Sequence, residues 1–384
     1  MKATVKSFFY KNYGTTPLVI KSPGRINIIG EHTDYNLGFV LPAAIDKGIY
    51  FAVQKNNTEF INIETFLEYQ AKIQFSTGGY TTNLNTSWGK YIQAMLQVLE
   101  AEHYAITGFD CAFGGDIPIG AGLSSSAALC CGFLYAVSEL FALKIPKKKI
   151  ALLAQKAEHK VGLNCGLMDQ YAVLFGKRGN TLFLDCKNLN YLYVPVALEG
   201  YSWILINSNI KHELAADSGY NERRKSCEHV VHVVKDENSS VSSLRDVDFD
   251  QLERIKNKIS KTDYKRAKYV LSENERVEAI IKAFQKNDAL LVGKILFEGH
   301  WALSKEYDVS TPKMDALVVI AQQQGVLGAR MMGGGFGGCT INLIQNDSIE
   351  TVITSIISNY KIKTGITAEY YQLKIDDGIS TINH

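Results

Sequence analysis

The chain contains little proline and almost no excess of charge of either sign. Of its 384 residues only 7 are proline, and 41 Lys and Arg residues are balanced by 39 Asp and Glu residues. Proteins that bind nucleic acid usually carry clustered basic residues and a strongly basic pI, whereas the pI of this chain is about 8.0. We therefore expect no nucleic-acid partner, and we expect any anionic ligand to be held by a few local groups.

Long apolar segments are absent as well. The longest apolar-leaning stretch, residues 127–137, is well short of the ~20 residues that cross a bilayer as a helix. The N-terminal segment 1–13 mixes lysines with aromatic residues and lacks the apolar core and cleavage site of a signal peptide. We therefore expect neither membrane attachment nor export.

The 7 cysteines are odd in number and form no CxxC pair. Secreted proteins that depend on disulfides usually carry an even number of cysteines, whereas cytoplasmic thiols stay reduced. We expect a cytoplasmic protein with free thiols, and we expect it to be a monomer.

The length of the chain predicts two domains. A chain of 384 residues exceeds what one hydrophobic core usually organises, so a cleft between two cores is expected. The polar Glu199–Gly200 step precedes a fresh strand-like run and places the boundary there, giving domains at 1–198 and 199–384.

Both element types occur in both halves. Short β-branched and aromatic runs between turn residues predict strands of a mixed sheet in the first half, and apolar residues at helical spacing predict helices. Because the two types alternate without a regular βαβ order, the sequence predicts an α+β fold. The predicted elements nearest the motifs below are strands at 18–21 and 26–29, helices at 89–103, 124–141, 148–161 and 273–284, and strands at 203–207 and 339–344.

A loop rich in glycine and serine, residues 118–128, predicts a phosphate site. Gly120 and Gly122 let backbone N–H groups approach an anion, and the helix that follows presents its positive end to it. A glycine turn with a serine N-cap would explain one serine but not the run Ser124–Ser126. No Walker A sequence is present, so the phosphate site is of another kind.

A second glycine-rich segment, residues 333–338, formally matches the dinucleotide fingerprint G-x-G-x-x-G. The residues after it read as a strand instead of the helix that a Rossmann fold requires. We therefore reject dinucleotide binding. The glycines instead predict close approach of this backbone to a ligand or to another loop.

Polar side chains gather in two further places. Residues 24–38 hold an arginine, two carboxylates and a histidine, a set suited to a hydroxylated ligand, although a solvated loop would also be polar. Glu158 ends a predicted amphipathic helix, and Asp169 follows among apolar neighbours. Each of these two acids could be purely structural.

Taken together, these motifs closely resemble the galactokinases, a family within the GHMP superfamily of small-molecule kinases. The resemblance implies two α+β domains, an N-terminal mixed-sheet domain and a C-terminal α/β sandwich, with the active site in the cleft between them. It also implies transfer of the γ-phosphate of ATP to the anomeric hydroxyl of galactose, the first kinase step of galactose catabolism. The matching blocks are 24–45, 118–128, 157–159, 165–170, 212–224 and 328–339.

The resemblance also implies roles for single residues. Asp169 is similar to the catalytic carboxylate, as a base or an electrostatic guide, and Arg25 is similar to the partner that keeps it charged and stabilises the phosphoryl group. The residues that resemble the sugar pocket are Glu31, His32, Asp34, Gly166 and Tyr220.

On the nucleotide side, the resemblance implies ATP and Mg²⁺. Ser126 and Glu158 resemble the magnesium ligands, with Ser125 as a possible substitute for Ser126, and Trp88 and Tyr91 resemble an aromatic pair near the adenine. The residues that resemble the phosphate cradle are Gly120, Gly122, Leu123, Ser124, Ser125 and Ser126.

Two alternatives and one departure accompany this interpretation. A kinase of the same superfamily acting on N-acetylgalactosamine or arabinose would share most of these motifs. A non-catalytic galactose sensor would lose part of the serine loop, which is intact here at Ser124–Ala127. Met332 stands where we would expect a small hydroxyl residue, which affects the fine adjustment of that loop.

Overall fold

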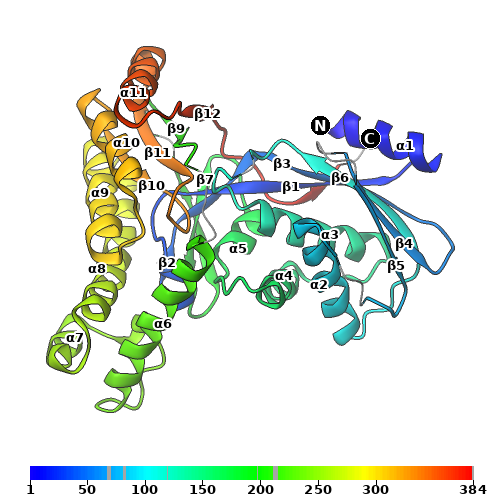
Figure 1. Cartoon of the computed structure of the whole chain (residues 1–384), viewed down its shortest axis with the longest axis horizontal. Helices are drawn as coiled ribbons and strands as arrows, with labels where there is room; N and C mark the ends of the chain where they lie inside the picture. Colours follow the sequence, from blue (N-terminus) through cyan, green and yellow to red (C-terminus); the bar gives the residue numbers. More distant parts are fainter. Residues whose placement is uncertain (67–70, 81–83, 119, 197, 211–214, 383–384) are drawn as a thin grey trace.

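The computed structural model describes residues 1–66, 71–80, 84–118, 120–196, 198–210 and 215–382. Two sheets with their own helices lie at opposite ends of the molecule (Figure 1). The α+β class predicted from the sequence is confirmed. Residues 212–214 of one matching block, and residue 119 of the phosphate loop, fall outside the described residues.

The first sheet has six strands in the order β13-β1-β3-β6-β4-β5. Its helices α2 to α5 cover one face, and α1 covers the other. These strands are β1 (Leu18–Asn27), β3 (Pro42–Lys55), β4 (Phe60–Thr65), β5 (Ala71–Ser76), β6 (Phe109–Gly115) and β13 (Ser380–Thr381). The helices are α1 (Lys2–Tyr13), α2 (Ser87–Ala101), α3 (Ser125–Leu140), α4 (Lys147–Val161) and α5 (Met168–Phe175).

The period of two in a strand decides which helices each side chain meets. Phe51 and Val53 of β3 pack among α2 to α5, whereas Ala52 between them faces α1 and contacts the cluster around Phe9. Both faces of the sheet are therefore covered, and β3 is apolar on both sides.

Two strands predicted at 18–21 and 26–29 are one strand in the structure. β1 runs from Leu18 to Asn27, and its pairing with β3 shifts between Pro23 and Arg25. Pro23 has no N–H to give to the ladder, so the strand continues through an irregularity instead of ending. Because the strand is continuous, Arg25 lies on it close to the phosphate loop, where it bonds the Gly122 carbonyl.

The second sheet has four strands in the order β10-β11-β9-β12 and lies between two helical layers. Ile204 and Ile206 of β9 pack on α10 and α11, whereas Leu205 packs toward α8 and α9. This alternation gives the sandwich that the family resemblance implied. The elements are β9 (Tyr201–Asn207), β10 (Gly328–Met331), β11 (Cys339–Gln345), β12 (Glu369–Gln372), α8 (Lys261–Gln285), α9 (Ala289–Ala302), α10 (Pro312–Gln323) and α11 (Ile349–Thr364).

The remaining elements connect the two sheets. A three-stranded sheet in the order β2-β7-β8 lies between them, and α6 extends toward the bottom of the view (Figure 1). The last strand, β13, pairs with β1, so the chain returns from the second sheet to the first. Residues 375–382 therefore lie along the first sheet, although the boundary predicted at 198/199 assigns them to the second domain. These elements are β2 (Phe39–Val40), β7 (Asn180–Asp185), β8 (Asn190–Pro195), α6 (Ala215–Lys235) and α7 (Phe249–Arg254).

Within the described residues, none of the helices combines the length and the apolar character needed to span a bilayer.

Helix α3 packs closely against the first sheet at Gly132. The phosphate loop lies at the N-terminus of this helix. A Cβ added at Gly132 would lie 2.2 Å from Phe51 Cε2 and 2.7 Å from Ser22 Cβ. Ser22 also donates a hydrogen bond to the carbonyl of Ala128 at 2.7 Å. Only glycine at 132 permits this packing.

We expect Gly132→Ala to lower the free energy of unfolding by about 1–3 kcal/mol because the methyl group overpacks the helix-sheet contact. Urea denaturation measures this change. Gly299→Ala in α9 is the matched control, since a Cβ there would meet its nearest atoms only at 3.8 Å. The packing argument fails if the two variants have the same stability.

Candidate active site

A cavity of about 560 Å³ opens between the two sheets. It is bounded by the end of β1, the phosphate loop before α3, the start of α5, the start of α6 and the glycine-rich loop after β10. The structure thus brings together all the residues that the sequence interpretation assigned to the sugar, to catalysis and to the phosphate loop. These are Arg25, Glu31, His32, Asp34, Gly120, Gly122, Leu123, Ser124, Ser125, Ser126, Gly166, Asp169 and Tyr220.

Arg25 and Asp169 form a bidentate ion pair in this cavity. Arg25 Nε donates to Asp169 Oδ1 at 2.6 Å and Nη2 donates to Oδ2 at 2.9 Å. The third donor, Arg25 Nη1, bonds the carbonyl of Gly122 at 2.6 Å. A planar guanidinium used in this way fixes the orientation of the carboxylate. It also ties the carboxylate to the phosphate loop.

The phosphate loop leaves the first N–H groups of α3 without a side-chain cap. Ser124 occupies the N-cap position in the left-handed region with φ of 56°, and it makes no capping hydrogen bond. Its hydroxyl donates to Asp169 Oδ2 instead. The free N–H groups at the start of an α-helix, together with the helix dipole, form a site suited to a phosphate group.

Asp34 lies next to Asp169 and touches Gly166. Its side chain is buried, and burial together with the nearby Asp169 charge raises its pKa to about 6. A Cβ at position 166 would lie 2.1 Å from Asp34 Oδ2. Glycine at 166 is therefore required for Asp34 to reach its position.

His32 is surrounded by aromatic rings at the base of the cavity. Its Nδ1 lies 2.8 Å from the Tyr35 hydroxyl, and its ring centroid lies 5.4 Å from that of Tyr220. Burial, with the positive charge of Arg223 nearby, lowers its pKa to about 3. The imidazole is therefore neutral at physiological pH, with one donor and one acceptor nitrogen.

Glu31 lies in the cavity wall and has partners in the second half of the chain. Its carboxylate forms an ion pair with Arg330, and its Oε1 accepts a hydrogen bond from the Gly333 N–H at 3.2 Å. The carbonyl of Glu31 accepts a hydrogen bond from the Tyr269 hydroxyl at 3.0 Å. The polar loop of residues 24–38 is thus anchored to α8 through Tyr269 and to β10 through Arg330.

Trp88 and Tyr91 do not line the first cavity. They lie at the start of α2 and line a second cavity of about 1230 Å³. The two cavities share Pro118, Ser125 and Ser126 of the phosphate loop. The phosphate loop therefore borders both cavities.

Glu158 of α4 is buried behind the phosphate loop. Its carboxylate accepts hydrogen bonds from the side chains of Ser126, Gln170 and Cys165. Among the described residues none forms an ion pair with it, and burial raises its pKa to about 7. A buried carboxylate beside a hydroxyl, with no cation to balance it, is a donor set of hard oxygens that suits Mg²⁺.

Some residues of the site were not found from the sequence. Cys165 and Phe336 line the cavity, and Tyr35 orients His32. Met332, the departure noted above, is buried, and its Sδ accepts a hydrogen bond from the Asn27 N–H at 3.2 Å. Tyr35 lies within the polar loop of residues 24–38, which is the one feature of the sequence that could have indicated it.

The pKa of Glu158 predicts a pH-dependent stability. Because its pKa is raised from 4.5 to about 7 in the folded protein, the unfolded chain loses this proton first, and stability is lost as pH rises from about 4.5 to 7. Glu158→Gln removes this loss. We measure both proteins in the absence of Mg²⁺. From pH 5 to pH 8, we expect the free energy of unfolding of Glu158→Gln to increase relative to that of the wild type by at most about 3 kcal/mol.

Urea unfolding at pH 5 and pH 8 measures the difference. Glu102→Gln is the control, since two lysines lower the pKa of Glu102 to about 2 and its contribution is constant over this range. A stability difference for Glu158→Gln that is the same at both pH values would contradict the assigned burial effect.

Three family sequence models match the chain in succession. The galactokinase galactose-binding signature matches residues 7–55, the GHMP kinases N terminal domain matches residues 90–177, and the GHMP kinases C terminal domain matches residues 247–362. The galactokinase of Fusobacterium nucleatum is 38% identical over 366 residues, which cover 94% of each chain. The galactokinase of Thermotoga maritima is 38% identical over 365 residues, covering 94% of this chain and 99% of that one.

Solved structures agree with these sequence relatives. The crystal structure of Lactococcus lactis galactokinase complexed with galactose matches with a TM-score of 0.93 and 31% identity, over 99% of this chain and 100% of that one. A mevalonate kinase matches with a TM-score of 0.65 at 17% identity, over 94% of this chain and 99% of that one, which shows a shared fold. The chain therefore belongs to the galactokinase family of the GHMP kinases.

Proposed function

We propose that the protein transfers the γ-phosphate of ATP to the anomeric hydroxyl of D-galactose and releases galactose 1-phosphate. The observation that carries this proposal is the meeting of two cavities at the phosphate loop, with the Arg25–Asp169 pair on the sugar side of the junction. ATP is the phosphate donor that the kinase family uses. The galactose bound in the Lactococcus lactis relative supports the choice of sugar.

Asp169 acts on the anomeric hydroxyl. Its carboxylate is oriented by Arg25 and Ser124, so it presents an acceptor oxygen to the attacking O–H. A well-placed carboxylate can accept the proton as the O–P bond forms, or it can orient the hydroxyl electrostatically. Such a group contributes about 10²–10⁴ in rate.

Arg25 and the start of α3 stabilise the transferring phosphoryl group. Phosphoryl transfer requires mainly positioning and neutralisation of charge on the equatorial oxygens. The N–H groups of the loop at Gly120, Gly122 and Leu123 and of Ser124–Ser126 supply donors, and Arg25 supplies a fixed positive charge. The hydrogen bonds of Arg25 to Asp169 and to the Gly122 carbonyl fix its orientation, so little reorganisation of this charge is needed during the reaction.

Ser126 and Glu158 would hold Mg²⁺ between the two cavities. When bound, this ion neutralises phosphate charge and orients the phosphates for in-line attack. Two protein oxygens suffice because Mg²⁺ usually keeps waters and phosphate oxygens as its other ligands. Trp88 and Tyr91 line the second cavity, where their aromatic faces suit the adenine ring.

The sugar hydroxyls are recognised by Asp34, His32, Glu31 and Tyr220, with the Gly166 backbone. Asp34 and Glu31 are acceptors, and neutral His32 has Nε2 for a hydroxyl, because its Nδ1 is paired with the Tyr35 hydroxyl. Each carboxylate oxygen of Glu31 has a second lone pair, so its bonds to Arg330 and Gly333 leave room for a hydroxyl. An epimer that leaves one of these buried groups unpaired loses about 1–3 kcal/mol of binding.

The wider setting follows from the composition. We propose a monomer that works in the cytoplasm, supported by seven free cysteines, six of them buried. The substrates are small molecules. No other partner is needed for the reaction, since the described residues of one chain supply every role named above.

A coupled assay that follows ADP release tests the function across galactose, its epimers, N-acetylgalactosamine and arabinose. We expect galactose to give the highest kcat/KM. A higher kcat/KM for another sugar would show that galactose is not the preferred substrate, while the assignment as a sugar kinase would stand. Binding of galactose and ATP with no sugar phosphate formed would instead indicate a sensor.

Asp169→Asn tests the catalytic carboxylate. We expect kcat to fall by about 10²-fold or more, because the amide neither accepts the proton nor balances Arg25. Galactose binding, measured by calorimetry, should persist. Asp377→Asn, at an exposed carboxylate, is the control and should keep the wild-type kcat. Wild-type turnover by Asp169→Asn would remove Asp169 from the mechanism.

Asp34→Ala tests the sugar pocket. We expect the KM for galactose to rise by about tenfold or more, with the KM for ATP within twofold of the wild type, because Asp34 lies only in the first cavity. Initial-rate kinetics with each substrate varied in turn measure both constants. An unchanged KM for galactose would refute the assignment.

A further inference from the structure

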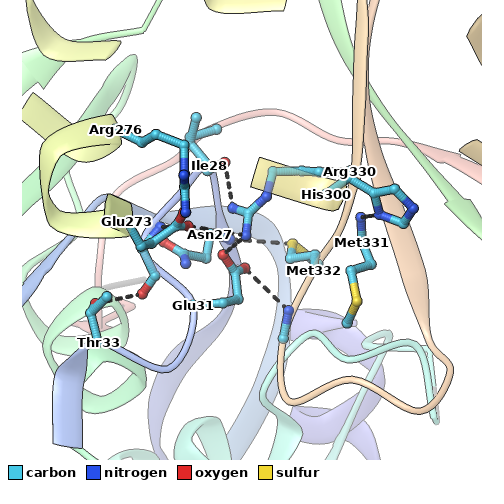
Figure 2. A network of polar contacts seen from close by, with 12 residues as sticks. Asn27, Ile28, Glu31, Thr33, Glu273, Arg276, His300, Arg330, Met331 and Met332 are labelled. Carbon is cyan, nitrogen blue, oxygen red and sulfur yellow. Dashed lines mark hydrogen bonds and ion pairs between the residues drawn. The ribbon is translucent and has the colours of Figure 1, made fainter. Parts of the chain in front are cut away.

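Four charged side chains, three of them buried and one partly exposed, form a chain of alternating sign beneath the sugar side of the cavity. They are Glu31, Arg330, Glu273 and Arg276, and Figure 2 shows Arg330 at the centre of the group, between the two glutamates. Glu31, Arg330 and Glu273 are at most 1% exposed. Of the four, Glu31 alone lines the cavity.

Arg330 spans three segments of the chain. It lies on β10, its Nη1 donates to the carbonyl of Ile28 at 2.9 Å, and its Nη2 pairs with Glu31 and lies 3.5 Å from Glu273 Oε1. Glu273 in turn accepts the Gly30 N–H at 3.0 Å. The backbone just before Glu31 is thus held from the second half of the chain.

This network is poorly explained by stability alone. Taking ions out of water is costly, and well-packed apolar side chains of similar volume often stabilise a fold as well as a buried ion pair does. Removing one partner, however, leaves a buried charge without compensation. Such an ion-pair network is better suited to fixing the orientation and charge of Glu31, the one of the four residues that lines the cavity.

We propose that Arg330 is a positioning residue for sugar binding, which holds the Glu31 carboxylate charged and aimed into the cavity without itself touching substrate. This inference rests on the proposed function, because it assigns Glu31 to a sugar hydroxyl. The Gly333 N–H bonds the other oxygen of Glu31. The glycine-rich loop beside the phosphate site and the sugar pocket therefore share one carboxylate.

The arginine side chain suits this position because its fork reaches the three acceptors at once. A lysine at 330 would keep the charge but present a single ammonium group, so it could not bond Ile28, Glu31 and Glu273 in the same geometry. The substitution therefore separates the charge of Arg330 from its role in orientation.

The electrostatics support the same role. The pKa of Glu31 is raised overall: burial raises it most, the positive charge of Arg330 opposes this rise, and the negative charge of Glu273 adds to it. Tyr269 bonds the Glu31 carbonyl, and Arg276 pairs with Glu273 at 2.6 Å. Arg330 is thus the cation that opposes protonation of Glu31, and its loss raises the Glu31 pKa further.

The test compares Arg330→Met, Arg330→Lys and the double variant Arg330→Met/Glu31→Gln with the wild type. For Arg330→Met we expect the KM for galactose to rise by about tenfold or more, with the KM for ATP within twofold. Its KM for galactose should fall more steeply than that of the wild type as pH is raised from 6 to 9, because the loss of Arg330 raises the pKa of Glu31 further and a rising pH then restores the Glu31 charge. Asp34, whose pKa is about 6, adds the same slope to both proteins.

The other two variants separate charge from structure. The double variant has no carboxylate at position 31, so we expect a high KM with only the pH slope that Asp34 gives the wild type and a melting temperature above that of Arg330→Met. Arg330→Lys should raise the KM for galactose by about threefold or more, with a pH slope no steeper than that of the wild type. Should Arg330→Met fail to fold, these two variants decide the matter.

Arg266→Met is the matched control, since Arg266 is another buried arginine that pairs with a glutamate outside the cavity. It should lower the melting temperature but leave both KM values unchanged. A KM for galactose within twofold of the wild type in Arg330→Lys and in the double variant would overturn the proposal. Failure of the wild type to phosphorylate galactose would instead overturn the proposed function.

Discussion

The bidentate ion pair between Arg25 and Asp169 is the interaction on which the rest of the site depends. It joins the end of a strand to the start of a helix that is 144 residues away in the sequence, and its third donor holds the phosphate loop at Gly122. The packing of β1 and α3 brings the two residues of this ion pair and the phosphate loop together. Strand β1 passes through Pro23 without ending, and α3 approaches the sheet closely enough to require Gly132.

Much of the fold could be predicted from local patterns, and the errors have physical causes. Helix α1 was not predicted because, of its residues, only Val5 and Phe9 are buried, which gives too weak a periodic pattern. Helix α5 is short and largely buried, so it shows no amphipathic period. In the second half the pattern of β9 and β11 was legible, because an apolar run between two helical layers is typical of a central strand.

The site was predictable as a set of motifs but not as a geometry. Composition and spacing marked the phosphate loop and the polar loop at 24–38, and the family resemblance gave their roles. The buried partners of Glu31 were not found, although Glu273 lies at the spacing of apolar Val270 and Val277 along α8. A carboxylate on the buried face of a helix requires a partner, and the sequence does not tell which distant cation supplies it.

Strand β13 adds a constraint that concerns synthesis of the chain. It pairs with β1 at Ile20 and Lys21, and β1 leads directly to Arg25. During translation, the first sheet emerges with this edge of β1 unpaired, and it stays unpaired until residues 380–381 have been made. An open strand edge is prone to pair with other chains, so the nascent first domain carries such an edge at β1 until the ribosome has delivered β13.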